Sequence, residues 1–260
     1  MEIKILDYDY FGKKYDLLIH NNKINGVMLL NQDDFIGALT LNTNKYKIII
    51  NDIKILKKEY NNYKKYISYV PYYIINKTYI NINSLINSYI IDNELKIKNP
   101  EKKIKDALRI VGLSKEILYK NHLELSSSEK KLLIIAMSLL SNPKLLILDE
   151  PFKALDKKNK RIISILIRRL KEQFKITIVI ISDDSEIIYK YTDNVISFTN
   201  DKIIQMNSEE CFTNYDLLKN NDLSIPESTE FTNMAIRIKK TKIEYHKDIR
   251  DIIKDIYKHI

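Results

Sequence analysis

Two adjacent carboxylates, Asp149 and Glu150, are the residues of this chain best placed to do chemistry. They follow a short apolar run, LLIL at residues 145–148, and such a run before acids predicts a buried strand. In open parallel sheets ligands bind at the carboxyl ends of strands, where one carboxylate can hold Mg²⁺ and another can orient or deprotonate a water. The alternative is an acid pair that only solvates the strand end.

The acid pair stands between two predicted helices. Before it, residues 125–129 read LSSSE, in which the serines can cap a helix and Glu129 falls in the first turn. Apolar residues then recur with helical spacing at Leu132, Leu133, Ala136, Leu139 and Leu140. After the pair, Ala154-Leu155-Asp156 precedes a second helix, whose apolar side is predicted at Ile162, Ile163, Leu166 and Leu170.

This order of parts resembles the ATP-binding-cassette (ABC) ATPases. LSSSE stands where that family has its LSGGQ signature, LLILDEP is a full Walker B motif, and KALD matches the D-loop. The resemblance is specific because three motifs occur in order at family spacing. It implies an α/β fold with a mixed β-sheet flanked by helices, a small helical subdomain, and ATP with Mg²⁺ as cofactors. Asp149 would be the residue that holds the metal.

Composition indicates a globular chain. Of 260 residues, 45% are hydrophobic and 30% charged, enough for a sizeable core. One cysteine, Cys211, excludes an internal disulfide framework and suits a reducing cytoplasm. No apolar run reaches the roughly 18 residues that span a bilayer, and the N-terminal residues do not have the pattern of a signal peptide. We expect any membrane association to be peripheral.

The formal net charge is +9, but the lysines are spread among Asn, Ile and Tyr with no dense basic block. We attribute the charge to an AT-rich genome, so no nucleic-acid partner is expected. A charged partner or an anionic membrane face is the lesser alternative.

Residues 2–10 alternate as a strand, and residues 26–31 (GVMLLN) predict a buried one. By the resemblance, Tyr10 matches the aromatic residue that stacks on adenine. A tyrosine of the core or surface is an equal alternative, since the chain has 18 tyrosines.

The phosphate-binding loop that should follow is missing. Such a loop needs glycines for backbone N–H groups to wrap the phosphates, a lysine, and a Ser or Thr for Mg²⁺. Residues 32–40 read QDDFIGALT, and no lysine occurs between Lys23 and Lys45. The next strand pair is predicted at 46–50 and beyond, which leaves too few residues for the loop and a helix of about three turns. We infer that the loop has been lost.

Residues 57–120 show helical spacing, which fits the family's inserted helical subdomain at about 57–124. Ile104, Ala107, Leu108 and Val111 form one stripe that ends at Gly112. The family has a glutamine at the entry of this subdomain that senses the γ phosphate. Tyr72 stands there instead, and no glutamine lies between Gln32 and Gln173.

Two further motifs depart from the family. Ser127 and Ser128 replace the signature glycines, while Ser126 keeps the hydroxyl, and the helix N-terminus still offers N–H groups. A strand predicted at 176–181 is followed by Asp183, where the family has a histidine beside the γ phosphate. A carboxylate beside a phosphate is unfavourable, which indicates an inactive switch. A final strand pair is predicted at 195–198 and 202–204.

The tail resembles the ATPase subunits of energy-coupling-factor (ECF) transporters for vitamins and metal ions. The residues that carry this match are Phe212, Leu217, Leu218, Leu223 and Pro226. A last helix is predicted with a stripe of Ile249, Ile252, Ile253 and Ile256, for packing or dimer contact. We therefore divide the chain into an ABC ATPase-like domain, 1–205, and a C-terminal ECF-type helical extension, 206–260.

From this resemblance we expect a degenerate ATPase subunit at the cytoplasmic face of the membrane, inactive alone. It would pair with an intact ECF-type ATPase and dock a transmembrane subunit. Its Leu125, Ser126, Ser127, Ser128, Glu129 and Asp156 would complete the partner's ATP site, while Asp149 and Glu150 would be vestigial or structural.

Two alternatives belong to other classes. One is a scaffold of ABC fold that binds no nucleotide. The other, a soluble translation-factor-like ABC protein, ranks last because such proteins usually carry two cassettes with intact phosphate loops.

Overall fold

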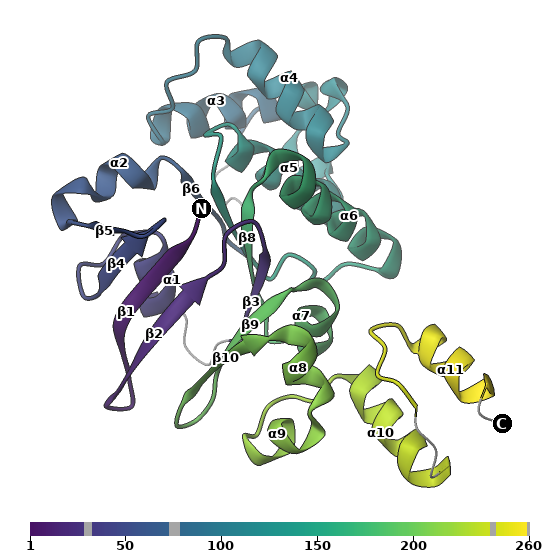
Figure 1. Ribbon diagram of the computed structural model, residues 1–260. Helices are drawn as coiled ribbons and strands as arrows, with labels where there is room; N and C mark the ends of the chain where they lie inside the picture. Colours follow the sequence, from purple (N-terminus) through teal and green to yellow (C-terminus); the bar gives the residue numbers. More distant parts are fainter. Residues whose placement is uncertain (29–32, 73–78, 240–242, 259–260) are drawn as a thin grey trace. The chain divides into compact units, whose positions relative to one another are not determined.

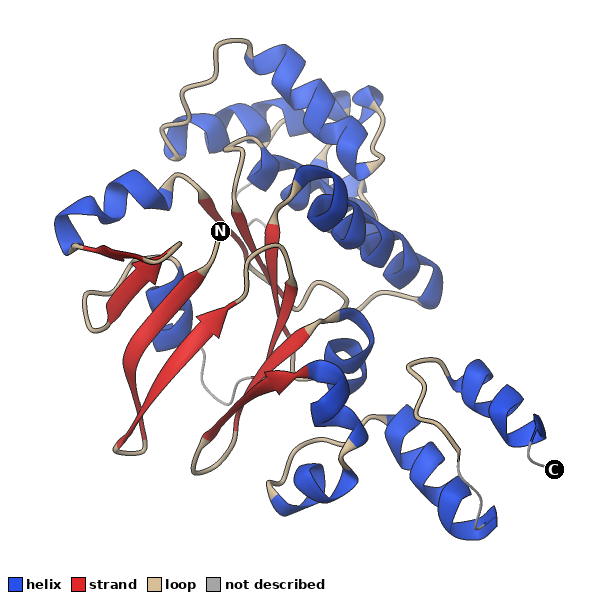
Figure 2. Cartoon of the chain, viewed as in Figure 1, coloured by secondary structure: helices blue, strands red, loops and turns tan. Residues whose placement is uncertain are grey.

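The computed structural model describes residues 1–28, 33–72, 79–239 and 243–258 (Figures 1 and 2). The chain divides into two compact units, one made of Met1 and Leu56–Ile178 and the other of Glu2–Ile55 and Val179–Ile260. Both contain helices and strands, and parallel as well as antiparallel strand pairs occur. The predicted α/β fold with mixed strand pairing and flanking helices is therefore confirmed.

The division into units does not follow the predicted domain boundary. Residue 205 lies inside strand β10 (Ile203–Asn207), within the second unit, and strand β8 (Thr177–Ile181) leads the chain from the first unit into the second. The assignment of 1–205 and 206–260 as domains stays a prediction.

In the first unit, strands β6 (Ile67–Val70) and β7 (Leu145–Asp149) pair in parallel, with Tyr69 opposite Ile147. All four apolar residues at 145–148 are completely buried, which confirms the predicted strand. Helix α5 (Ser127–Leu139) packs against β6. The second predicted helix is α6 (Lys157–Phe174). Its buried stripe includes Ile163, but Ile162 is 40% exposed, so its placement on the apolar side was wrong.

The region expected to be helical, 57–124, contains one strand among the residues that the structure describes. Ile67–Val70 forms β6 by pairing with β7, and its residues alternate between half-buried and buried, as the period of two of a strand requires. The other elements are 3₁₀ helix η1 (Lys57–Glu59), α2 (Tyr60–Lys64), α3 (Ile82–Asp92), α4 (Pro100–Val111), η2 (Lys115–Tyr119) and η3 (His122–Glu124).

Helix α4 has the stripe that its sequence predicts. Asn99 accepts a hydrogen bond from the Lys102 N–H as N-cap, and Pro100 occupies the first turn. The four predicted apolar residues are buried, and Gly112 ends the helix with a φ of 82°. α4 packs on α5, which anchors the helical region to the helix that follows the LSSSE segment.

The second unit contains a four-stranded antiparallel sheet in the order β2-β1-β4-β5. Its strands are β1 (Ile3–Tyr10), β2 (Lys13–Ile19), β4 (Lys47–Ile50) and β5 (Ile53–Ile55). Ile3 and Ile5 are completely buried, as the alternation predicts. The strand predicted at 2–10 and the strand pair predicted from residue 46 are both confirmed.

Strand β3 (Ile24–Met28) pairs in parallel with β9 (Asn194–Phe198), which pairs antiparallel with β10. The predicted final strand pair is thus present. The strand predicted at 26–31 is confirmed as far as Met28, and residues 29–31 lie outside the described residues. Helix α7 (Ser185–Tyr191) packs on β3 at Gly26.

Among the described residues, four helices follow in the C-terminal part of the second unit: α8 (Ser208–Thr213), α9 (Tyr215–Asn220), α10 (Glu227–Lys239) and α11 (Ile249–Lys258). Phe212 and Leu218 are completely buried, and Thr229 donates to the Phe212 carbonyl at 2.7 Å. On α11 only Ile252 is buried, while Ile249 is 46% exposed. Within the described ranges, no helix has the length and apolarity needed to cross a bilayer.

Gly26 is needed where α7 crosses β3. A Cβ at this position would lie 2.7 Å from Ile188 Cγ2 and 2.9 Å from Thr192 Oγ1. Both atoms belong to buried residues in a packed interior, so we expect Gly26→Ala to lower the free energy of unfolding by about 1–3 kcal/mol. Urea unfolding followed by circular dichroism measures this.

Gly37, inside helix α1 (Asp33–Leu39), is the matched control, since a Cβ there would meet Thr43 only at 3.6 Å. Gly37→Ala should be neutral or stabilising by up to about 1 kcal/mol because alanine favours the helix. An equal loss in both variants would contradict this account of Gly26.

Candidate functional site

The acid pair lies at the end of β7, as its sequence predicts. Asp149 is the last strand residue and is half-buried, and Tyr69 of the neighbouring β6 donates its hydroxyl to Asp149 Oδ2 at 2.9 Å. Glu150 is only 8% exposed and has a φ of 45°, a conformation that L-residues with side chains rarely adopt. Pro151 follows, which disfavours this conformation further. Glu150 is therefore held in place by its surroundings.

Lys131 of α5 supplies part of those surroundings. Its Nζ donates to the Glu150 carbonyl at 2.6 Å, and the side chain is buried. Burial lowers the pKa of Lys131, while the carboxylates of Glu150 and Asp149 act in the opposite direction. The sequence analysis missed this residue. The signal that could have found it is a lysine on the same face of α5 as the buried Ile135 and Ser138.

Tyr72, which stands at the glutamine position, faces two lysines. Its ring centroid lies 5.0 Å from Lys131 Nζ and 5.3 Å from Lys153 Nζ, within the range of cation–π attraction. The structure thus brings Tyr72, Lys131 and the acid pair together within the first unit. These contacts are made entirely by groups of the first unit.

The LSSSE segment begins α5 with a capping box. Ser126 Oγ accepts from the Glu129 N–H at 3.3 Å, and Glu129 Oε2 accepts from the Ser126 N–H at 2.9 Å and from its hydroxyl at 2.7 Å. These hydrogen bonds hold the pKa of Glu129 below its ordinary value. Leu125 is buried, Ser127 is exposed, and Ser128 Oγ lies 3.2 Å from Ser126 Oγ. The predicted helix start is confirmed.

Asp156 is the N-cap of α6. Its carboxylate accepts from the Asn159 N–H at 2.8 Å and from the Asn159 amide at 3.1 Å. The residue is exposed, and its position just before the helix agrees with the sequence pattern.

The other predicted site residues lie in the second unit. Tyr10 is half-exposed, packs edge-on against Phe198 at 5.3 Å, and donates its hydroxyl to the Thr199 carbonyl. Burial raises the pKa of Tyr10, which keeps this hydroxyl a donor. Asp183 follows β8 and borders a hollow of about 180 Å³ shared with Met28 and Asp222. The hollow therefore has two acids in its lining.

The segment between β3 and α1, where the sequence predicts that the phosphate loop is lost, is short. Met28 ends β3 and Asp33 begins α1, so residues 29–32 alone separate them, and Gln32 lies outside the described residues. Asp34 forms an ion pair with Lys45, which holds the pKa of this carboxyl below its usual range. Phe35 is completely buried against the rings of Tyr8 and Phe198. The first turn of α1 is thus acidic and its inner face is core.

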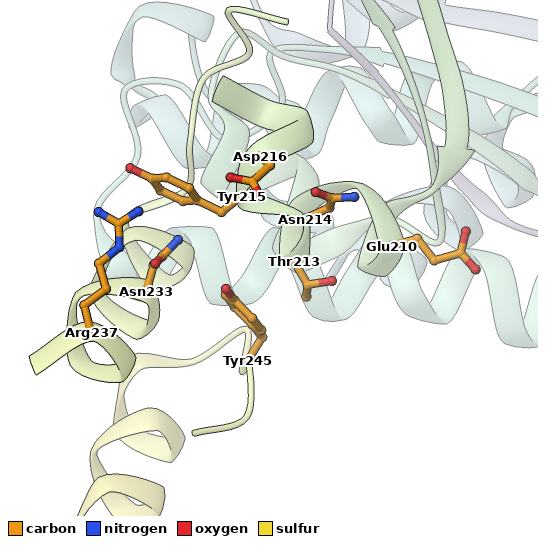
Figure 3. Close-up of a pocket in the computed structure, with 8 residues that line it drawn as sticks. All are labelled: Glu210, Thr213, Asn214, Tyr215, Asp216, Asn233, Arg237 and Tyr245. Atoms are coloured by element: carbon orange, nitrogen blue, oxygen red, sulfur yellow. The ribbon is translucent and has the colours of Figure 1, made fainter. Parts of the chain in front are cut away.

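A larger polar hollow of about 610 Å³ lies in the C-terminal part of the second unit (Figure 3). It is lined from α8 to α10 and by Tyr245, and the Arg237 guanidinium lies 5.3 Å from the Tyr215 ring. None of the residues predicted for a site lines it.

Comparisons with known proteins agree on one family. The family model described as "ABC transporter" matches residues 36–153. Among curated proteins, the energy-coupling factor transporter ATP-binding protein EcfA3 of Oenococcus oeni is 33% identical over 165 residues, which cover 62% of this chain and 56% of that protein. The EcfA2 protein of Caldanaerobacter subterraneus is 31% identical over 153 residues, covering 58% and 52%. The chain carries an ABC transporter ATPase domain.

Solved structures show the same fold. CbiO1 from Clostridium perfringens, described as part of the ABC transporter complex cbiONQ, aligns with a TM-score of 0.71 over 89% of this chain and 98% of its own, at 22% identity. The ABC cassette MJ0796 aligns with a TM-score of 0.64 at 16% identity, over 79% and 98%. By sequence, the chain matches only about half the length of its curated relatives.

ABC ATPases generally use ATP with Mg²⁺, so the acid pair of this ABC domain can be tested against a metal. Mg²⁺ demands oxygen ligands in near-ideal octahedral geometry. Here Asp149 accepts from Tyr69, and a buried ammonium contacts the next residue. Both acids are thus engaged by groups of the protein, and the buried ammonium opposes a divalent cation, so the residues present do not fit a resident Mg²⁺.

The capping box allows a direct test by pH. Ser126→Ala should lower the free energy of unfolding by about 1 kcal/mol at pH 7. In the folded protein the pKa of Glu129 lies below its ordinary value of 4.5. The contribution of Glu129 to the free energy of unfolding is therefore fully present above pH 4.5 and is lost as the pH falls through the folded pKa. The cost of Ser126→Ala should therefore shrink below about pH 4.5 in urea titrations.

Ser127→Ala, at an exposed position of the same turn, is the matched control and should change stability by less than about 0.5 kcal/mol. A cost of Ser126→Ala that is independent of pH would argue against the role given to Glu129.

Proposed function

We propose that this chain is a degenerate ATP-binding subunit of an ECF-type transporter that pairs with an intact ATPase subunit to energise uptake of a vitamin or metal ion. The observation that carries the proposal is the shortness of the segment that connects β3 to α1. Residues 29–32 cannot contain a phosphate loop of about eight residues, and the following turn presents Asp33 and Asp34.

The signature segment and Asp156, which the chain could contribute to a partner's ATP site, keep more of the family pattern than the segment before α1. In the family each ATP lies between the phosphate loop of one protomer and the signature of the other. Helix α5 begins at a capped N-terminus where Ser126 and Ser127 are exposed. Asp156 is the exposed N-cap of the next helix, α6. These residues support a composite site that belongs to the partner's nucleotide.

The remaining parts of the proposal follow from the transporter type. Exposed apolar side chains in the helical region, among them Ile91 and Leu123, offer a surface for the coupling helix of a transmembrane subunit. The chain would then lie at the cytoplasmic face of the membrane, held there by its partners.

One observation favours the alternative of a scaffold that binds no nucleotide. Tyr69 already contacts Asp149, and Lys131 already contacts Glu150. An acid pair engaged in this way needs no ligand to be stable. The two functions differ in whether the chain alters the ATPase activity of a partner.

The direct test is the ATPase activity of a complex reconstituted from this chain, an intact ECF-type ATPase of the same genome and the transmembrane subunit. Ser126→Arg should abolish the activity because it places a bulky side chain at the signature contact. Ser126→Ala loses the same cap and the hydroxyl without added bulk, so it should lower the activity only in part. Asp149→Asn should leave turnover within about twofold, since on this proposal the chain's own site takes no part in hydrolysis.

Loss of activity in Asp149→Asn would instead place turnover in this chain's own site. Full activity in Ser126→Arg would favour the scaffold.

Glu129 gives a second prediction, with the opposite sign. Its carboxylate lies 2.7 Å from the Ser126 hydroxyl and would repel a phosphate that approaches this turn. Glu129→Gln keeps an acceptor but removes the charge, so the ATPase activity of the complex should rise by about tenfold or less, equivalent to about 1.4 kcal/mol. Unchanged or lower activity would show that the segment does not meet phosphate.

A further inference from the structure

A buried lysine side chain, Lys131, contacts the acid pair. Lys131 is 8% exposed, and its Nζ lies 2.6 Å from the Glu150 carbonyl and 5.0 Å from the centre of the Tyr72 ring. An ammonium buried to this extent needs acceptors and opposite charge close by. The carbonyl, the ring face and the two neighbouring carboxylates meet that need.

The contact also fixes the backbone at the acids. Glu150 has a φ of 45° and precedes a proline, two conditions that together disfavour its conformation. Donation from Lys131 to the carbonyl of this residue helps to hold the backbone in the rare conformation. The lysine on α5 is therefore part of how the end of β7 is shaped.

A divalent ion would meet three obstacles here. The positive charge of Lys131 repels a divalent ion. Lys153, which also contacts the Tyr72 ring, adds a second positive charge. Asp149 Oδ2 already accepts from Tyr69 at 2.9 Å. The acid pair has its charge compensated within the protein, so a metal gains little by entering.

We propose that Lys131 acts as the resident cation of the Walker B acids and closes this site to divalent metal. The inference rests on the proposed loss of this chain's own nucleotide site. It adds that the acid pair there does not take a divalent metal. In this view Lys131, Tyr72 and Tyr69 form one contact network around the acids, which takes the place of a bound metal ion.

The test is Mn²⁺ binding by the purified full chain, measured from the electron paramagnetic resonance signal of free Mn²⁺, without partner or nucleotide. Wild type should bind with a dissociation constant no tighter than about 1 mM. Lys131→Met keeps the length and apolar stem but removes the charge, so it should bind at least about tenfold tighter. Lys131→Met/Asp149→Asn should lose the gain.

Lys130→Met is the matched control, because it removes the same charge one residue away, from a side chain that is not buried. It should bind Mn²⁺ as wild type does. Equal binding by wild type and Lys131→Met would overturn the proposal, as would a gain of the same size in Lys130→Met.

Wild type itself supplies a test if Lys131→Met does not fold, which circular dichroism would show. Micromolar Mn²⁺ binding by wild type that Asp149→Asn abolishes would overturn the proposal. Binding no tighter than about 1 mM, equal in wild type and Asp149→Asn, would support it. Because no partner takes part, these outcomes are independent of whether the chain completes another subunit's ATP site.

Discussion

The contact of Lys131 with Glu150 and Tyr72 is the interaction on which the candidate site depends. It joins α5, which begins at the LSSSE segment, to the end of β7 and to the residues after β6. In an ABC ATPase these three places serve the nucleotide. Here a buried ammonium connects them, so contacts inside the chain arrange the acids of the first unit.

The same site shows which parts of ABC chemistry the chain retains. The buried strand, the acids at its end and the capped helices α5 and α6 are all present, and each is stabilised by contacts inside the chain. The means of holding phosphate is what we propose the chain has lost, since α1 starts with two acids and buries Phe35. On that proposal, the capped starts of α5 and α6 are what the chain offers to a partner's ATP.

Local patterns predicted well wherever the residues alone decide the structure. The alternation of β1, the stripe of α4 with its Gly112 end, and the cap at Ser126 depend on neighbours a few residues away. Features set by packing were missed. The strand β6 forms because β7 is there to pair with it, and Lys131 is buried because the end of β7 supplies its acceptor.

The central claim is that this chain holds no nucleotide by itself. It is tested most directly by titrating the purified chain with a fluorescent ATP analogue and Mg²⁺. The account predicts no saturable binding up to millimolar concentrations. Saturable binding at micromolar affinity, about −8 kcal/mol, would mean that a different phosphate site exists and would contradict the account.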